Sequence, residues 1–445
     1  MAALTRDVYE SYAEFFRRDS FLKFLLYLTL FGYFYNLGVV EFNITGDNPI
    51  RIYDFTGFFL ILYFLKYVKY ISLFSLSVPY TKWLYYFILW SFLMMFVTIF
   101  YYLLVKQNLI HIIQTLIYFF HMLLYFVVYV FFLHILSDPA EYKRFLYFFL
   151  FLVIGEGILV ILQYFGIVDF LWGQRRWFMY RGYLSGTLGP NRVVLGMTMF
   201  MSFVVSYTLM SKKIVKINRF VLASAMTLSA ILIISSGSRT SYIAFFIFFT
   251  YILFFAPGKT LKNLIWLSVF FMIMSWNYRD VINTAIETFK RRVMNKVSYE
   301  TVEERDVVQL YDELGSGRLD LTLLYLEIFA KNPYAIPFGT GFNNRMLHRT
   351  SAHNMYLNII KELGLVGFFL YFTWLYSYLF VRKKKRGLHI FKVTLHGLVL
   401  AMAITLFFGE HLYIFRPLYA LWGLFLFVTA VLLAPLHFWK TEEEY

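Results

Sequence analysis

The stretch Ser351-Ala-His-Asn-Met-Tyr-Leu-Asn-Ile-Ile-Lys-Glu-Leu-Gly-Leu-Val-Gly367 joins a long polar segment to an apolar helix. Ser351 is of a residue type that caps helices, so the pattern predicts that His353 lies in the first helical turn. The positive end of a helix dipole disfavours a protonated imidazole at that position. We therefore expect a neutral His353 ring that is able to accept a proton.

The composition of the chain excludes an ordinary soluble protein. Its 445 residues are 60% hydrophobic and 22% aromatic, 15% are charged, and the mean hydropathy is +0.63. These values are typical of a polytopic membrane protein that lies in a lipid bilayer. The net charge of +15 does not indicate nucleic acid, because the basic residues form short clusters between apolar runs. The chain contains no cysteine, which excludes disulfides and thiolate metal sites.

Apolar runs predict an all-α fold with about twelve transmembrane helices. Basic residues gather in alternate loops, as at Lys143-Arg144, Lys212-Lys213 and 382–386. The positive-inside rule then places both termini in the cytoplasm. The predicted spans lie near residues 21–40, 55–74, 84–105, 109–136, 145–167, 193–210, 220–236, 241–256, 264–276, 354–381, 393–409 and 412–437.

These spans divide the chain into three parts. We expect N-terminal transmembrane helices over 1–276, a large helical loop on the outer side over 277–352, and C-terminal transmembrane helices over 353–445. Within the loop, residues 318–331 have the spacing of an amphipathic helix that ends at Asn332-Pro333. The loop is therefore predicted to fold as a helical cap over an outward-facing cavity.

The loops predicted to face outward are also basic, but almost wholly through arginine. A guanidinium stays charged and has a planar fork that matches phosphate oxygens, whereas lysine is the commoner residue where only topology matters. The pattern indicates an anionic ligand at the outer face. Pairing with acids of the same loop or with lipid headgroups is the alternative. These arginines are Arg175, Arg176, Arg181 and Arg192 after the fifth span, and Arg279, Arg291, Arg292, Arg305, Arg318, Arg345 and Arg349 in the long loop.

Two arginines lie at the predicted start of a helix. Arg239 lies in Ser235-Ser-Gly-Ser-Arg-Thr-Ser241 between two spans, where Ser238 and its neighbours can cap the next helix and leave free amides beside the charge. An arginine at such depth costs roughly 3 kcal/mol on insertion scales, so it normally has a partner. Arg318 follows the flexible Gly315-Ser-Gly turn. Both predict an anion site; the alternatives are a snorkelling anchor for Arg239 and a purely structural role for Arg318.

A further turn, Gly186-Thr-Leu-Gly-Pro-Asn-Arg192, opens the sixth predicted span. Pro190 can initiate a helix, and the Asn191 amide can bind a sugar or a phosphate. A capped turn without a ligand is an equally weighted alternative. Glu156 lies inside the preceding span, where carboxylates are usually paired or functional.

The remaining histidines give weaker indications. His111, His121 and His134 lie on different faces of the fourth span and are expected to make buried hydrogen bonds. His348 and His411 lie on the outer side and are candidate helpers of His353. No pair has metal-ligand spacing backed by carboxylates, so we predict no metal site.

These motifs resemble the O-antigen ligase and O-antigen polymerase superfamily of bacterial inner-membrane glycan-transfer proteins. The family's mark is a histidine, a small polar residue, nine residues, a glycine, two residues and another small residue. His353, Asn354, Gly364 and Gly367 meet it. Other family features, in matching order over roughly residues 180–370, are met by Pro190-Asn191, Ser238-Arg239 and Ser316-Gly317-Arg318.

The resemblance implies a glycosyltransferase of the membrane-embedded, GT-C-like type in the bacterial inner membrane, with its active site on the periplasmic side. Its donor would be a glycan on undecaprenyl diphosphate, and it would need neither metal nor cofactor. A ligase acting on the lipid A core, in lipopolysaccharide biosynthesis, is the preferred interpretation. A polymerase acting on another lipid-linked glycan is the alternative, and a flippase or exporter of the same lipid-linked sugars is the third.

The resemblance also implies roles for individual residues. Arg239 and Arg318 would neutralise the departing diphosphate, and His353 would take the proton from the acceptor hydroxyl as it attacks the anomeric carbon. Such a one-step attack would invert the anomeric configuration. Substrate contacts are expected from Arg181, Asn191, Arg192, Ser238, His348 and Asn354.

Overall fold

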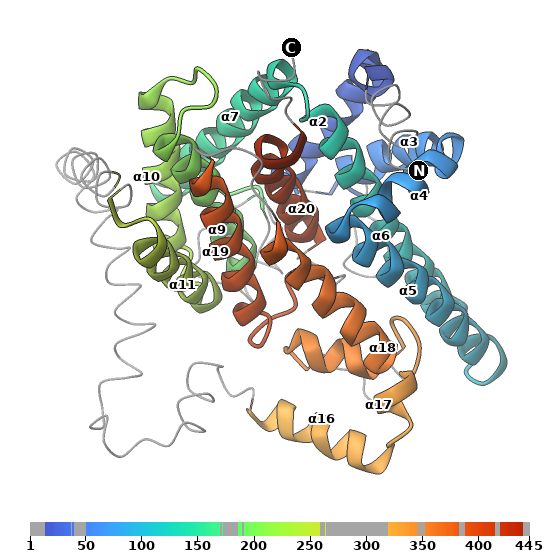
Figure 1. Cartoon of the computed structure of the whole chain (residues 1–445). Helices are drawn as coiled ribbons and strands as arrows, with labels where there is room; N and C mark the ends of the chain where they lie inside the picture. The colour runs from blue at the N-terminus through green and yellow to red at the C-terminus, as the bar shows by residue number, and fades with distance from the viewer. Residues whose placement is uncertain are drawn as a thin grey trace, which may run out of the picture.

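The computed structural model describes residues 14–36, 38–39, 50–169, 171, 186–188, 191–258, 263, 319–344, 347, 352–381, 388–413 and 419–438. In this part of the chain the secondary-structure elements are helices, most of which pack into one bundle (Figure 1). They are α2 (Ser20–Phe34), α3 (Ile52–Lys66), α4 (Val68–Ser77), α5 (Pro79–Leu104), α6 (Leu109–Ile135), α7 (Pro139–Tyr164), α9 (Arg192–Ser211), α10 (Arg219–Ser235), α11 (Arg239–Phe255), α16 (Leu319–Lys331), α17 (Ala335–Phe338), α18 (Met355–Ser377), η4 (Tyr378–Phe380), α19 (His389–Thr405), α20 (Tyr419–Leu433) and η5 (Ala434–Phe438).

The all-helical, polytopic prediction is confirmed in this part of the chain. Five helices are long and apolar enough to cross a membrane: α5, α6, α7, α9 and Met355–Phe380; the bent pair α3 and α4 makes up to six. Shorter apolar helices are α2, α10, α11, α19 and Ala420–Leu436. Helices suit this setting because a bilayer offers no partner for an unpaired backbone group. The total of about twelve spans stays a prediction, and the predicted span 264–276 lies outside the described residues.

The second predicted span, 55–74, is not one straight helix. The structure bends by 87° between α3 and α4, at Tyr67. The rings of Phe15 and Phe16 pack against the Tyr67 ring at the bend, with centroids 5.4 Å away in each case. Hydropathy does not reveal such a bend, because an apolar run has the same hydropathy whether the helix is straight or bent.

Contacts between α7 and α20 fix the direction of the helices around the site. Tyr142, near the start of α7, donates a hydrogen bond to the Val431 carbonyl near the end of α20. Further along α7, the Phe149 ring packs against Phe427, with centroids 5.4 Å apart. The two helices are therefore antiparallel, and α20 begins at the end of the bundle where α7 finishes.

The same end of the bundle collects the segments that carry most of the predicted site. Gln163, near the end of α7, binds Gly186, shortly before the start of α9. The chain returns to this end at the turn between α10 and α11, which contacts α9 at Gly196. Because α19 leads into α20, it also finishes here, and its Leu406 carbonyl accepts a hydrogen bond from Met355 N at 2.9 Å. We call this the site end: it holds the starts of α9, α11 and α18 and the end of α19.

The helix α18 falls within the predicted span near 354–381, and it is broken inside that span. Gly364 has φ 66° and ψ −172°, and the helix changes direction there (Figure 1). A Cβ at Gly364 would lie 2.7 Å from Gly339 N, so the break fits against the segment after α17. The carbonyls before the break accept hydrogen bonds from outside the helix: Lys361 O from Thr340 N at 2.8 Å, Glu362 O from Gly341 N at 2.9 Å, and Leu363 O from Trp90 Nε1 at 2.8 Å.

Candidate functional site

Two helices at the site end begin with the same local sequence, a polar cap followed by arginine. Asn191 caps α9, its side-chain oxygen accepting from Val193 N at 2.9 Å, and Arg192 is the first helical residue. Ser238 caps α11 in the same way, and Arg239 follows. Ser238 thus caps the helix as expected, and Asn191 has the capping role that was one of its two predicted roles. Each arginine is placed at the positive end of a helix dipole.

A close helix contact brings these two starts together. Gly196 lies one turn after Arg192 on α9, and a Cβ there would lie 2.7 Å from Ser236 Oγ. The Ser241 hydroxyl blocks the same position. Glycine at this point therefore lets the turn between α10 and α11 lie directly against α9. Gly237, with φ 65°, supplies the sharp turn that the sequence predicted.

The electrostatics of this junction favour an anion. The positive charge of Arg192 acts on Arg239 and also on the Tyr242 hydroxyl, so the two guanidinium groups repel each other. Two helix starts that each carry an arginine place positive charge at one junction. Helix starts and guanidinium forks both match phosphate oxygens.

His353 lies outside the helix that it precedes. The cap of α18 is Asn354, and the helix begins at Met355, so the prediction of His353 in the first turn after a Ser351 cap is wrong. The amide oxygen of Asn354 is the better acceptor here because it reaches two backbone donors. These are Tyr356 N at 3.0 Å and Leu357 N at 3.3 Å. Ser351 itself lies outside the described residues.

The backbone of His353 is held in an unusual conformation. Its φ is 50°, in the left-handed region that residues other than glycine seldom occupy. Its neighbours Ala352 and Asn354 are buried, whereas His353 is partly exposed. The Ala352 amide donates to Asn358 Oδ1 at 3.3 Å, which ties the chain to α18 before the histidine. Strain of about 1–3 kcal/mol persists only where the surroundings enforce it, and it is characteristic of functional sites.

Next to His353 lies a buried ionic cluster that the sequence did not single out. Lys361 and Glu410 are each only 4% exposed. Lys361 Nζ lies 3.4 Å from the Tyr325 hydroxyl of α16 and 4.0 Å from Glu362 Oε1. The Tyr413 hydroxyl donates to Glu362 Oε2 at 3.1 Å. Burial raises the pKa of Tyr325 above its ordinary value, as do the charges of Glu410 and Glu362, so this phenol stays protonated.

This cluster joins three segments around the histidine. Tyr325 belongs to α16, Lys361 and Glu362 to α18, and Glu410 to the segment after α19. The backbone of Ala352 also hydrogen-bonds the Tyr325 hydroxyl, which links the cluster to His353. The adjacent Lys361-Glu362 in an apolar helix was the signal available in the sequence, because charges in such a helix are usually functional.

Several predicted residues lie elsewhere or outside the described residues. Arg181, Arg318 and His348 belong to the undescribed part of the chain. His411, a candidate helper, is buried and hydrogen-bonds the Thr405 hydroxyl at 3.0 Å at the end of α19. The buried hydrogen bonds expected of the fourth-span histidines are confirmed: His111 with Asn343 O, His121 with Asp54 and Ile117 O, and His134 with Tyr70 and Val130 O.

One helix connects the arginine junction with the histidine. Gly397 of α19 packs against α11, where a Cβ would lie 3.0 Å from the Phe248 ring. Nine residues later, Leu406 accepts the hydrogen bond from Met355 at the start of α18. The junction of Arg192 and Arg239 and the segment of His353 thus share one end of the bundle, with α19 between them.

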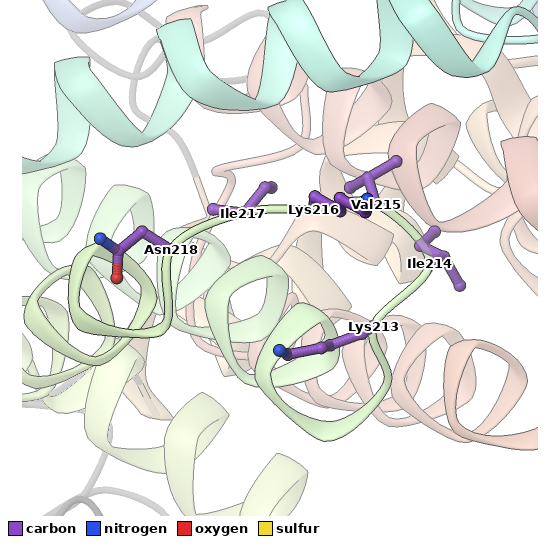
Figure 2. A pocket seen from close by; sticks show the side chains of 6 residues that line it. All are labelled: Lys213, Ile214, Val215, Lys216, Ile217 and Asn218. Atoms are coloured by element: carbon purple, nitrogen blue, oxygen red, sulfur yellow. The ribbon is translucent and has the colours of Figure 1, made fainter.

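A surface cavity of about 450 Å³ lies far from these residues. It is lined by Lys213–Asn218, which form most of the loop between α9 and α10 (Figure 2). This loop is at the other end of α9 from Arg192. Its lysines belong to the basic clusters that predict a cytoplasmic loop, so we exclude the cavity from the candidate site.

The fold defines a multi-pass helical membrane protein. Residues 224–372 match the family model described as O-antigen ligase, about a third of the chain. This matched region supports the O-antigen ligase and polymerase superfamily. Members of this family are glycosyltransferase-like enzymes that act on lipid-linked glycans in a membrane. No curated protein sequence matches the chain significantly.

The matched region contains much of the described site. It includes the turn before α11, α16, α17 and the first part of α18 with His353. The start of α9, with Asn191 and Arg192, and the segment with Glu410 lie outside it. Among the described residues, no group of three or more histidine and carboxylate side chains is arranged to hold a metal ion.

Proposed function

We propose that the protein is a metal-independent, inverting membrane glycosyltransferase of the O-antigen ligase type. It transfers a glycan en bloc from undecaprenyl diphosphate to a hydroxyl group of the lipid A core, at the periplasmic face of the inner membrane. Joining of lipid-linked repeat units by a polymerase uses the same donor chemistry. The observation that carries the proposal is the pair of capped helix starts with Arg192 and Arg239, at the same end of the bundle as His353.

The chemistry follows from what each group can do. The acceptor oxygen attacks the anomeric carbon while the bond from that carbon to the diphosphate oxygen breaks. His353 takes the proton that the hydroxyl loses. The negative charge that grows on the departing diphosphate is met by Arg239 and Arg192, with Arg318 as a further candidate. Attack opposite the leaving group inverts the anomeric configuration.

The ionic cluster lies in the same region as His353. Its link to the histidine segment runs through Tyr325, which meets Lys361 and the backbone of Ala352. The positive junction then serves the phosphate, and the segment around His353 serves the acceptor.

Reconstitution with defined substrates tests the proposal. We expect purified protein to transfer glycan from an undecaprenyl diphosphate donor only when the lipid A core is present. With lipid-linked repeat units alone, a ligase leaves them unchanged, whereas a polymerase lengthens them, which mass spectrometry distinguishes. Movement of donor across sealed vesicles without any new glycosidic bond would instead identify a flippase and contradict the proposal.

The predicted sidedness can be tested by labelling because the chain has no cysteine. Lys106 lies exposed between α5 and α6, and Thr98 of α5 binds the Phe342 carbonyl in the segment that contacts broken α18. Lys213 lies exposed in the loop at the opposite end. We expect a membrane-impermeant maleimide, applied to cells with a permeabilised outer membrane, to label Lys106→Cys. Lys213→Cys should react only after the inner membrane is opened; the reverse pattern would place the site in the cytoplasm.

A further inference from the structure

Glu156 lies within α7, yet its carboxylate binds a loop. The residue is 5% exposed. Its Oε1 accepts a hydrogen bond from Thr187 N at 2.8 Å, and its Oε2 lies 2.7 Å from Thr187 Oγ1. Two turns further along the same face of α7, Gln163 Oε1 accepts from Gly186 N at 2.9 Å. Two polar side chains of one helix thus clamp the loop 186–188.

The clamp is tight. Gly186 has φ 58°, which favours glycine, and a Cβ there would lie 2.8 Å from Glu156 Cδ. Any larger residue would push the loop away from α7. The loop therefore has little freedom to shift while Glu156 holds it.

The N-terminal helices hold the loop from its other side. Thr187 Oγ1 lies 2.8 Å from the Phe34 carbonyl at the end of α2. Asn36 Nδ2 donates to the Leu188 carbonyl at 3.1 Å, and Arg51 Nε donates in turn to the Asn36 carbonyl at 3.2 Å. This chain of buried hydrogen bonds gives the first helices, which lie outside the matched family region, a defined connection to the site.

A short tether joins the clamp to the arginine junction. Two residues separate Leu188 from Asn191, so the cap of α9 lies within about 11 Å of the clamped loop. We propose that Glu156 is a positioning residue: by clamping the loop 186–188 it fixes the start of α9, and so holds Arg192 beside Arg239 for the donor diphosphate. This inference rests on the proposed function, because it assigns the arginine pair to that substrate.

The geometry indicates which variants separate hydrogen bonding from charge. The Thr187 hydroxyl has one hydrogen but two oxygen neighbours, Glu156 Oε2 and the Phe34 carbonyl. A glutamine at position 156 can accept from Thr187 N with its oxygen and donate to Thr187 Oγ1 with its nitrogen. Thr187 then donates to Phe34. Glu156→Gln should keep the clamp, whereas Glu156→Ala loses it.

The experiment measures kcat and donor KM of the full-length protein in liposomes, together with binding of undecaprenyl diphosphate and thermal unfolding. We expect Glu156→Ala to raise donor KM, lower kcat and weaken undecaprenyl diphosphate binding, so that kcat/KM falls about tenfold or more, and Glu156→Gln to stay within about threefold of wild type. In an Arg192→Ala background, Glu156→Ala should raise donor KM by less than a further factor of about two. The two substitutions remove the same interaction with the donor, so their effects should not multiply. Thr187→Val, which keeps the backbone hydrogen bond, should shift KM in the same direction and replaces Glu156→Ala if that variant does not fold.

Glu141 is the matched control, because it is a buried glutamate of the same helix at the opposite end, where it pairs with Lys23 at 3.1 Å. Glu141→Ala should leave donor KM unchanged even if it lowers the unfolding temperature. If the effects of Glu156→Ala and Arg192→Ala on donor KM multiply in the double variant, the two residues act independently. That result would overturn the inference and leave the proposed function intact. If Arg192→Ala alone has no effect on donor binding, the arginine site of the proposed function fails, and the inference fails with it.

Discussion

Replacing His353 with alanine should lower the rate of glycan transfer by about 10²-fold to 10⁴-fold, while the protein stays folded and still binds the lipid-linked donor. A hydroxyl group is a poor nucleophile until a base takes its proton, and no other side chain in the segment between Ala352 and Met355 can do so. Single-turnover transfer from a labelled donor measures the chemical step, and binding of undecaprenyl diphosphate measures the donor site separately.

His389→Ala is the control for this prediction. His389 is exposed at the start of α19, at the end of the bundle opposite the site, and its loss should leave the rate unchanged. Unaltered turnover in His353→Ala would remove the general-base role. A loss of donor binding equal to the loss of rate would instead assign His353 to the substrate site.

Replacing Arg239 with alanine should lower turnover by about 10²-fold or more, comparable with removing one donor from an oxyanion hole. The diphosphate gains charge as the sugar leaves, so an interaction with it is stronger in the transition state than in the ground state. Arg239→Lys keeps the charge but not the planar fork, and should recover only part of the activity. Steady-state kinetics in liposomes with a fixed acceptor concentration measure both effects.

The chain supplies a close control for Arg239. Arg219 is likewise the first residue of a helix, α10, after a capping asparagine, Asn218, but it lies at the opposite end of the bundle. Arg219→Ala should retain wild-type turnover. A loss below about threefold in Arg239→Ala would show that this arginine anchors the helix in the membrane and has no part in transfer.

Much of the fold could be predicted because hydropathy reports directly on helices that must satisfy their own backbone in lipid. The turn before α11 was also predictable, because Gly237 and Ser238 have distinct conformational and capping preferences. The break at Gly364 was not, because glycine is common in membrane helices and becomes a break only when other segments bind the exposed carbonyls. Those segments are far away in the sequence.

The local patterns of the candidate site could be predicted from the sequence, but the contacts between its segments could not. The pattern of cap and arginine at Asn191-Arg192 and Ser238-Arg239 can be read locally, but their pairing depends on the approach of Gly196, a tertiary contact. His353 adopts its left-handed conformation between two residues that are tied to α18 by hydrogen bonds, and these tertiary ties cannot be read from the local sequence.

The broken helix also has a consequence for biosynthesis. The indole of Trp90 donates a hydrogen bond to the Leu363 carbonyl across 273 residues of sequence, and the backbone amides of Thr340 and Gly341 donate to the two carbonyls before it. All three donors precede the break in the chain, so they have been synthesised before Gly364 is added. The broken helix therefore reaches its final conformation only against α5 and the segment after α17.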